Sequence, residues 1–94
     1  MRFEWDEAKA RRNLALHGVD FIDAIKVFAD PYRLENEDER HDYGERRFVT
    51  FGTVSDLVMA VVFTERPNSI RIISARRAEP NERKGYYQSH AGHQ

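Results

Sequence analysis

The strongest structural signal in this sequence lies in residues 46–77, RRFVTFGTVSDLVMAVVFTERPNSIRIISARR. Three parts of it are rich in the apolar, aromatic and β-branched residues that are typical of strands. Turn-forming residues separate these parts, first as Val54-Ser55-Asp56 and then as Pro67-Asn68. The pattern therefore predicts an antiparallel meander of three strands, which are Arg46–Thr53, Leu57–Glu65 and Ser69–Arg77.

Side-chain alternation divides these strands into two faces once their register is set. If the two turns set it, Arg71 lies opposite Thr64, and Thr64 lies opposite Arg46. The predicted core face then holds Val49, Phe51, Met59, Val61, Phe63, Ile70 and Ile72. The predicted open face holds Arg46, Phe48, Thr50, Ala60, Val62, Thr64, Arg71, Ile73, Ala75 and Arg77. A register one residue away would place Arg76 on the open face instead of Arg71 and Arg77.

Three guanidinium groups around small side chains make the predicted open face a shallow basic cradle. A guanidinium binds phosphate oxygens in a bidentate manner and keeps its charge, so the cradle suits a polyanion. The alternative is that these arginines are solvated or form structural ion pairs with Glu65, Glu79 and Glu82.

Helices are predicted before and after the meander in the sequence. Phe3–Trp5 reads as a short strand, after which Asp6 caps a helix that runs to His17 and ends at Gly18. A second helix begins after Asp20 and ends before Pro31. Its buried stripe is Phe21, Ala24, Ile25 and Phe28. A last helix covers about Pro80 to Gln88, and residues 89–94 form a frayed tail.

The charges are unevenly distributed although the net charge of the chain is only -1. Residues 35–45 contain six acidic residues and one arginine, whereas residues 66–84 contain six basic and two acidic residues. We expect a short strand at Tyr32–Leu34, followed by an acidic loop of about ten residues. His41 lies in that loop, just before the arginine-bearing strand, where an imidazole is suited to proton transfer.

Together these elements predict a single α+β domain over residues 1–94. The chain has no cysteine and no histidine pair at helical ligand spacing, so we expect no disulfide, no metal site and no cofactor. The longest apolar run, Leu57–Phe63, is far shorter than the roughly 20 residues of a membrane helix. We therefore expect a soluble cytoplasmic protein that makes no membrane contact.

Several stretches of the chain, in unbroken order, match one known pattern. They are Phe3–Lys9 leading to His17-Gly18-Val19, then Arg40–Arg46, and finally Thr64–Arg66 with Arg71–Arg76. In these stretches the chain resembles the BrnT toxins of bacterial toxin-antitoxin systems. It departs from the family pattern at Leu16, where a lysine is frequent, and at Glu79, where a better helix cap is usual.

The resemblance implies a RelE-like fold, with helices packed on one face of a small antiparallel sheet and a C-terminal helix. It also implies a ribonuclease that stops growth and is neutralised by a BrnA-like antitoxin. That antitoxin dimerises through a ribbon-helix-helix domain, so that the complex binds promoter DNA through the antitoxin and represses its own transcription.

The resemblance also implies a set of site residues. His41, Arg66, Arg71 and Arg76 match the catalytic pattern, and Lys9 matches an RNA-binding position. We add Arg46 and Arg77 as RNA-binding residues because of their predicted place on the open face. In a metal-free mechanism, Arg71 and Arg76 would hold the phosphorane charge, Arg66 would position RNA and His41 would transfer a proton. The general base is unassigned.

Two other functions are compatible with the residues. The net charge of -1 favours a non-catalytic, degenerate toxin that binds a protein or regulates transcription, because nucleic-acid binders profit from many cations on one surface. A structural dimerisation domain would need an exposed apolar patch, and arginines interrupt the one candidate face.

Overall fold

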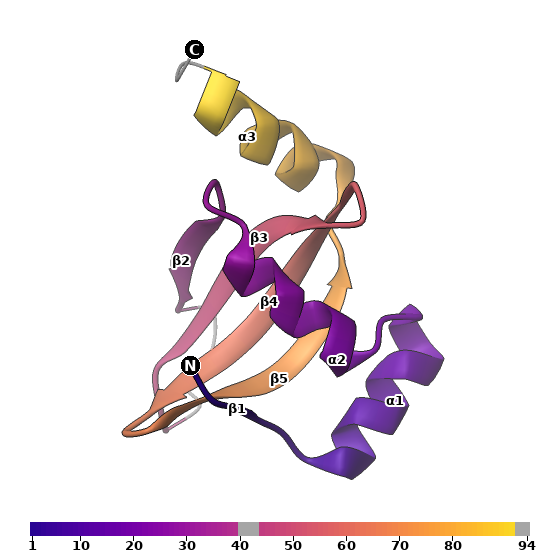
Figure 1. Cartoon of the computed structure of the whole chain (residues 1–94), viewed down its shortest axis with the longest axis vertical. Helices are drawn as coiled ribbons and strands as arrows, with labels where there is room; N and C mark the ends of the chain where they lie inside the picture. The colour runs from indigo at the N-terminus through magenta and orange to yellow at the C-terminus, as the bar shows by residue number, and fades with distance from the viewer. Residues whose placement is uncertain (40–43, 92–94) are drawn as a thin grey trace.

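The computed structural model describes residues 1–39 and 44–91. Within them the chain forms a five-stranded sheet, three α-helices and one 3₁₀ helix (Figure 1). In chain order the elements are β1 (Phe3–Glu4), α1 (Glu7–His17), α2 (Phe21–Ala24), η1 (Ile25–Ala29), β2 (Leu34–Asp38), β3 (Arg47–Val54), β4 (Leu57–Arg66), β5 (Ser69–Arg77) and α3 (Pro80–Ala91). The predicted α+β class is confirmed.

The sheet has the strand order β1-β5-β4-β3-β2. Strands β2 to β5 are antiparallel, as predicted for the meander, whereas β1 pairs with the beginning of β5 in parallel. The predicted small antiparallel sheet is thus present in β2 to β5, and the short strand at the N-terminus adds one parallel pairing at its edge. β1 contributes only the pairs Phe3↔Ile70 and Glu4↔Arg71, which leaves the rest of the outer edge of β5 to be covered by something else.

The acidic segment before residue 40 is a strand and not the predicted loop. In β2, Leu34–Asp38 pairs with β3 from Leu34↔Phe51 to Asp38↔Arg47. An edge strand needs backbone partners on one side only, and its charged side chains can remain in solvent, so the lack of apolar residues does not prevent pairing. The predicted strand at Tyr32–Leu34 begins too early, because residues 31–32 form a turn.

The predicted register between β3 and β4 was wrong by one residue. The hairpin closes at Val54↔Leu57, so the turn has two residues, Ser55 and Asp56, with φ of 50° and 68°. Positive φ at both central residues is the geometry of a type I′ turn, which matches the twist of the flanking strands. The shorter turn moves every side chain of β3 to the face opposite to the predicted one, so Arg47, not Arg46, shares a face with Thr64 and Arg71.

A bulge in β5 also changes the face of the sheet on which its later side chains lie. Thr64 pairs with Arg71 as predicted, and Phe63 pairs with Ile72, but Val62 pairs with Ser74. The extra residue, Ile73, shifts the alternation for the rest of the strand. Arg76 therefore lies opposite Ala60, on the same face as Arg71, whereas Arg77 lies opposite Met59 on the other face.

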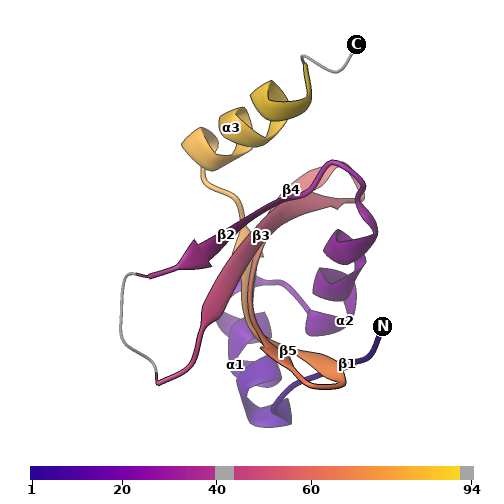
Figure 2. The same cartoon turned by 90° about the vertical axis from the view of Figure 1, so that its left-hand side faces the viewer.

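These registers define the two faces of the sheet that are named below. The face covered by α2 and η1 carries Phe48, Thr50, Gly52, Met59, Val61, Phe63, Ile70, Ile72 and Ala75. The other face, called the open face from here on, carries Arg47, Val49, Phe51, Val58, Ala60, Val62, Thr64, Arg71, Ser74 and Arg76. Figure 2 shows α2 beside the covered face, α1 next to β5 and α3 standing at one end of the sheet.

The main core lies between the covered face and the segment after α1. Val19, Phe21, Ala24 and Val27 are buried against the sheet. At Gly52 a β-carbon would come within 2.8 Å of a Val27 side-chain methyl, so glycine allows η1 to pack close to β3. The predicted second helix is correct in its place and its Asp20 cap, but its second half continues as a 3₁₀ helix.

The predicted caps of α1 are confirmed. The Asp6 side chain accepts a hydrogen bond from the backbone N–H of Lys9, and Gly18 ends the helix with φ of 70°. The buried contact of α1 is polar: Asn13 is only 7% exposed, while Leu14 and His17 are exposed.

None of the helices in the described part of the chain is long and apolar enough to cross a membrane.

The C-terminal helix α3 docks through a small core and two polar contacts. Ala78 and Tyr86 pack with Val58 and Phe51 at the end of the open face. The Tyr86 hydroxyl donates to Asp30, which also accepts from the backbone N–H and hydroxyl of Thr53. The second polar contact joins the first turn of α3 to β5 and belongs to the site described next.

Candidate nucleic-acid interface

A groove of about 410 Å³ runs across the open face. Strand residues Val49, Phe51, Val62 and Ser74 line it together with Arg76. Its other lining residues are Glu37, Asp38 and Glu39 from β2 and the residue after it, His17 at the end of α1, and Glu82 in the first turn of α3. The groove therefore joins elements that are far apart in the sequence.

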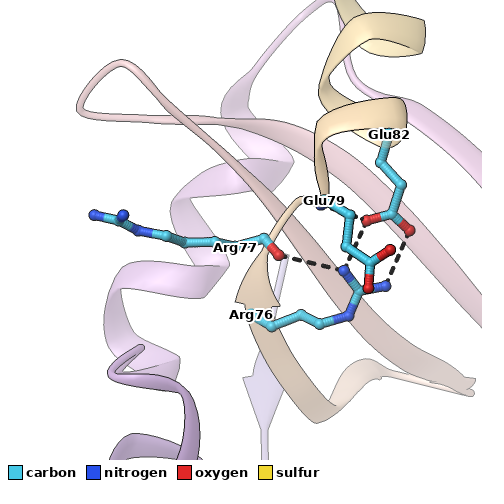
Figure 3. Close-up of polar contacts among 4 residues, drawn as sticks. All are labelled: Arg76, Arg77, Glu79 and Glu82. Atoms are coloured by element: carbon cyan, nitrogen blue, oxygen red, sulfur yellow. Dashed lines mark hydrogen bonds and ion pairs between the residues drawn. The ribbon is translucent and has the colours of Figure 1, made fainter.

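Arg76 and Glu82 form the most specific polar contact at this groove. Arg76 Nη1 and Nη2 donate to the two carboxylate oxygens of Glu82 at 2.7 and 3.0 Å. The same carboxylate accepts the backbone N–H of Glu79 at 2.8 Å, as an N3 residue does in a capping box. Figure 3 shows Arg76 and Glu82 pointing toward each other while the side chain of Arg77 points away. Arg76 thus forms an ion pair with Glu82, one of the three acidic residues predicted as partners of the open-face arginines.

Arg71 and Arg47 lie on the same face as Arg76 but do not line the groove. Arg71 is half-buried at the beginning of β5, where β1 pairs with it. Its positive charge contributes to the lowered pKa of Asp6, although the hydrogen bond from the Lys9 backbone is the larger cause. Among the described residues, the strands thus place three arginines on the open face, as predicted, but the set is Arg47, Arg71 and Arg76.

Arg66 and Arg46 line a separate hollow of about 420 Å³ with Glu45, Phe48, Thr64, Glu65 and Pro67. Arg66 pairs with Glu45 at 3.5 Å and lies 4.0 Å from Glu4. Arg46 donates to Glu37 at 2.7 Å and lies over the Phe48 ring. The hydrogen bonds from Arg46 lower the pKa of Glu37. The prediction that Arg46 shares a face with Arg71 was wrong, because the two-residue turn exchanges the two faces of β3.

Lys9 lies in a third hollow, of about 330 Å³, next to the groove. Its other lining residues are Arg12, Asn13, Leu16, His17, Ile73 and Ser74. His17 and Ser74 line both the groove and this hollow, so the two depressions adjoin along the edge of β5. Lys9 and Arg12 thus extend the positive charge of the open face from Arg76 onto α1.

The acidic and basic segments of the sequence meet at the groove. Glu37, Asp38 and Glu39 line it together with Arg76. The sequence indicates two separate regions of opposite charge, but the pairing of β2 with β3 brings the acidic segment to the open face. A polyanion that enters the groove therefore meets positive charge on the β5 and α1 side and negative charge on the β2 side.

The predicted site residues are only partly brought together. His41 lies outside the described residues, and Arg77 is exposed on the covered side of the sheet. Sequence reasoning missed Glu82 and His17 as groove residues. A usable signal for His17 was its position four residues after Asn13, because residues i and i+4 share one face of a helix.

Within the residues described, no three histidine, aspartate or glutamate side chains gather as a set of metal ligands.

Comparison with known proteins places the chain in a family. A search of curated proteins gives no match. The family model described as "Ribonuclease toxin, BrnT, of type II toxin-antitoxin system" matches residues 5–82. This match begins just after β1, spans α1 to the first turn of α3, and includes His17, Arg76 and Glu82. The chain therefore belongs to the BrnT family of ribonuclease toxins of type II toxin-antitoxin systems.

Proposed function

We propose that this protein binds RNA across the open face and cleaves it at the groove without a metal ion. The observation that carries the proposal is the position of Arg76, whose guanidinium lies at the groove in a chain of the BrnT family. A phosphate that reaches this guanidinium can be bound by two parallel N–H donors.

The proposed reaction is an attack of the RNA 2′-hydroxyl on the adjacent phosphorus. It forms a 2′,3′-cyclic phosphate and releases a 5′-hydroxyl. Negative charge builds on the phosphorane oxygens. Arg76 stabilises it at the groove, and Arg71 adds positive charge from outside the groove on the same face. Arg66 positions the RNA, and His41 protonates the leaving oxygen.

The path of the RNA follows the distribution of charge. Lys9 and Arg12 extend the cationic surface along α1, so the strand approaches Arg76 from that side and avoids the acidic residues of β2. Arg46 and Arg77 lie away from the groove, and in this proposal they bind only phosphates of RNA that extends beyond the open face.

The proposed partner is a BrnA-like ribbon-helix-helix antitoxin in the cytoplasm. An antitoxin segment that fills the groove would block RNA by exclusion. With a net charge of -1, the toxin alone binds promoter DNA poorly, and the antitoxin supplies the DNA-reading element for autoregulation. Labelled promoter DNA mixed with the toxin, the antitoxin and the complex tests this assignment; tight, selective binding by the toxin alone would contradict it.

A second candidate function is a non-catalytic module that only holds the antitoxin or regulates transcription. One observation favours it: Glu82 already occupies both Nη atoms of Arg76, as in a structural ion pair. If this function is correct, the wild type has no ribonuclease activity, and substitution of Arg76 changes only the stability of the protein.

RNA cleavage by the purified chain in the presence of a chelator separates the two candidates. The proposed function predicts cleavage that is retained in chelator and lost in Arg76→Ala. Cleavage only after addition of Mg²⁺ or Mn²⁺ would contradict the metal-free mechanism, and no cleavage under either condition would favour the non-catalytic module.

A further inference from the structure

We propose that His17 is the general base that removes the proton of the attacking 2′-hydroxyl. This inference rests on the proposed function and assigns a role that the mechanism above leaves unfilled. It starts from the way α1 is fixed to the sheet, because that contact determines where His17 lies.

Asn13 joins α1 to the outer edge of β5. Its side-chain amide donates to the backbone carbonyls of Ala75 and Val19 at 2.8 and 3.0 Å. Its side-chain oxygen accepts the backbone N–H of Ala75 at 3.1 Å. Asn13 thus takes the place of a neighbouring strand at Ala75, where β1 has already ended. A buried asparagine with three such bonds fixes both the position and the rotation of the helix.

His17 follows Asn13 by four residues and so projects from the same face of α1. Ser74 and Arg76, the chain neighbours of Ala75, both face the groove. The anchor at Ala75 therefore holds the C-terminal end of α1 beside this part of β5, and His17 lines the groove together with Ser74 and Arg76. Gly18, in the left-handed conformation, ends α1 directly after His17 and turns the chain back toward the core.

The chemistry of the site requires a proton acceptor on the side where the 2′-oxygen attacks. Glu82 suits this role less well, because Arg76 and the Glu79 N–H already occupy its oxygens. A neutral imidazole accepts a proton near neutral pH. In the proposed step the O2′–H bond breaks and its proton passes to an imidazole nitrogen of His17. The O2′–P bond forms, the P–O5′ bond breaks, and the 5′-oxygen leaves with a proton from the acid.

A sulfur substitution in the substrate distinguishes a base from an acid. The probes are an RNA oligonucleotide that the wild type cleaves and the same oligonucleotide with a bridging 5′-sulfur at the cleaved linkage. A thiolate leaves without protonation, so loss of the acid matters little for the sulfur substrate, whereas loss of the base still matters. The proteins are wild type, His17→Asn, His17→Ala and the control Arg11→Gln, which removes an exposed positive charge from the same helix.

We expect both His17 variants to lower kcat by about 10²- to 10⁴-fold on both substrates, with KM little changed. Added imidazole should restore part of the activity of His17→Ala, and Arg11→Gln should remain close to wild type. Full activity of the His17 variants would overturn the inference. A defect confined to the oxygen substrate would also overturn it, because His17 would then be the acid. A wild type that cleaves no RNA would instead overturn the proposed function on which the inference rests.

Discussion

Glu82 binds both Nη atoms of Arg76 at 2.7 and 3.0 Å and at the same time caps the first turn of α3. One carboxylate therefore connects the C-terminal helix to the arginine that lies in the groove. An RNA phosphate that binds Arg76 must share this guanidinium with Glu82 or replace it. The shape of the groove and the availability of its arginine are thus coupled to the docking of α3.

Replacement of Arg76 should separate its charge from its planar geometry. We expect Arg76→Ala to lower kcat/KM for RNA cleavage by about 10²- to 10³-fold, as for loss of one transition-state donor. Arg76→Lys should restore little, because an ammonium group cannot form two parallel hydrogen bonds with phosphate. For Arg71 we also expect the alanine variant to lose activity and the lysine variant to restore little of it. The control is Arg83→Ala on the exposed surface of α3. Full activity of the lysine variants would mean that these arginines supply only general attraction.

Removal of the Asn13 side chain should destabilise the whole domain. Asn13→Ala leaves the N–H and C=O of Ala75 and the C=O of Val19 without their partner. We expect a loss of about 3 kcal/mol in the free energy of unfolding, since each unsatisfied buried group costs about 1–3 kcal/mol. For a domain of this size, Tm should fall by more than about 10 °C. Thermal unfolding followed by circular dichroism measures this, with Arg11→Ala as the control. An unchanged Tm would refute the anchoring role.

The contact between Tyr86 and Asp30 should make stability depend on pH. Burial and the hydrogen bond to Asp30 raise the pKa of Tyr86 from its ordinary value near 10 to about 12. The folded state thus favours the neutral phenol, so its contribution is complete below pH 10 and is lost as the pH rises toward 12.

Asp30 behaves in the opposite sense. Burial alone would raise its pKa, but hydrogen bonds from Tyr86, Thr53 and Tyr32 outweigh burial and lower it. Its contribution is therefore present above its ordinary pKa and is lost as the pH falls through the lowered value.

Tyr86→Phe tests this contact. We expect a loss of about 1–2 kcal/mol at neutral pH, where one donor to the carboxylate is removed. We also expect the variant to lack the part of the alkaline stability loss that Tyr86 causes in the wild type. Urea unfolding between pH 7 and 11 measures both effects. Parallel pH profiles for the two proteins would contradict the prediction.

Neutralisation of the acidic side of the groove should strengthen RNA binding. Glu39 is exposed and lines the groove. We expect Glu39→Gln to lower Kd for single-stranded RNA by about twofold at low salt, as for one charge of the same sign removed in water. The gain should fade as salt screens the charges. Asp23→Asn, which makes the same change of charge on α2, is the control. An equal effect of both variants would mean that only net charge matters.

Local chemistry made many elements predictable. Asp6 and Gly18 mark the two ends of α1, and Pro31 marks the end of the segment that begins after Asp20. The apolar composition of residues 46–77 correctly predicts three strands. These features depend on residues that are near one another in the chain.

The distribution of side chains between the two faces of the sheet depends on finer backbone geometry. A three-residue turn and a two-residue turn both fit Val54-Ser55-Asp56, and only the positive φ of Ser55 and Asp56 selects the shorter one. Nothing in the local pattern marks Ile73 as the extra residue of a bulge, so the exchange of Arg77 for Arg76 was not predictable from alternation. The groove role of His17 depends on Asn13 and Ala75, which are 62 residues apart in the sequence.

The chemical identity of the RNA ends after cleavage tests the proposed mechanism most directly. Purified toxin is incubated with a defined RNA in chelator, and the fragments are analysed by mass spectrometry. Attack by the 2′-hydroxyl predicts a 2′,3′-cyclic phosphate on the upstream fragment and a 5′-hydroxyl on the downstream fragment, and both should form much more slowly with Arg76→Ala. A 3′-hydroxyl on the upstream fragment and a 5′-phosphate on the downstream fragment would contradict the mechanism, because water would then be the nucleophile.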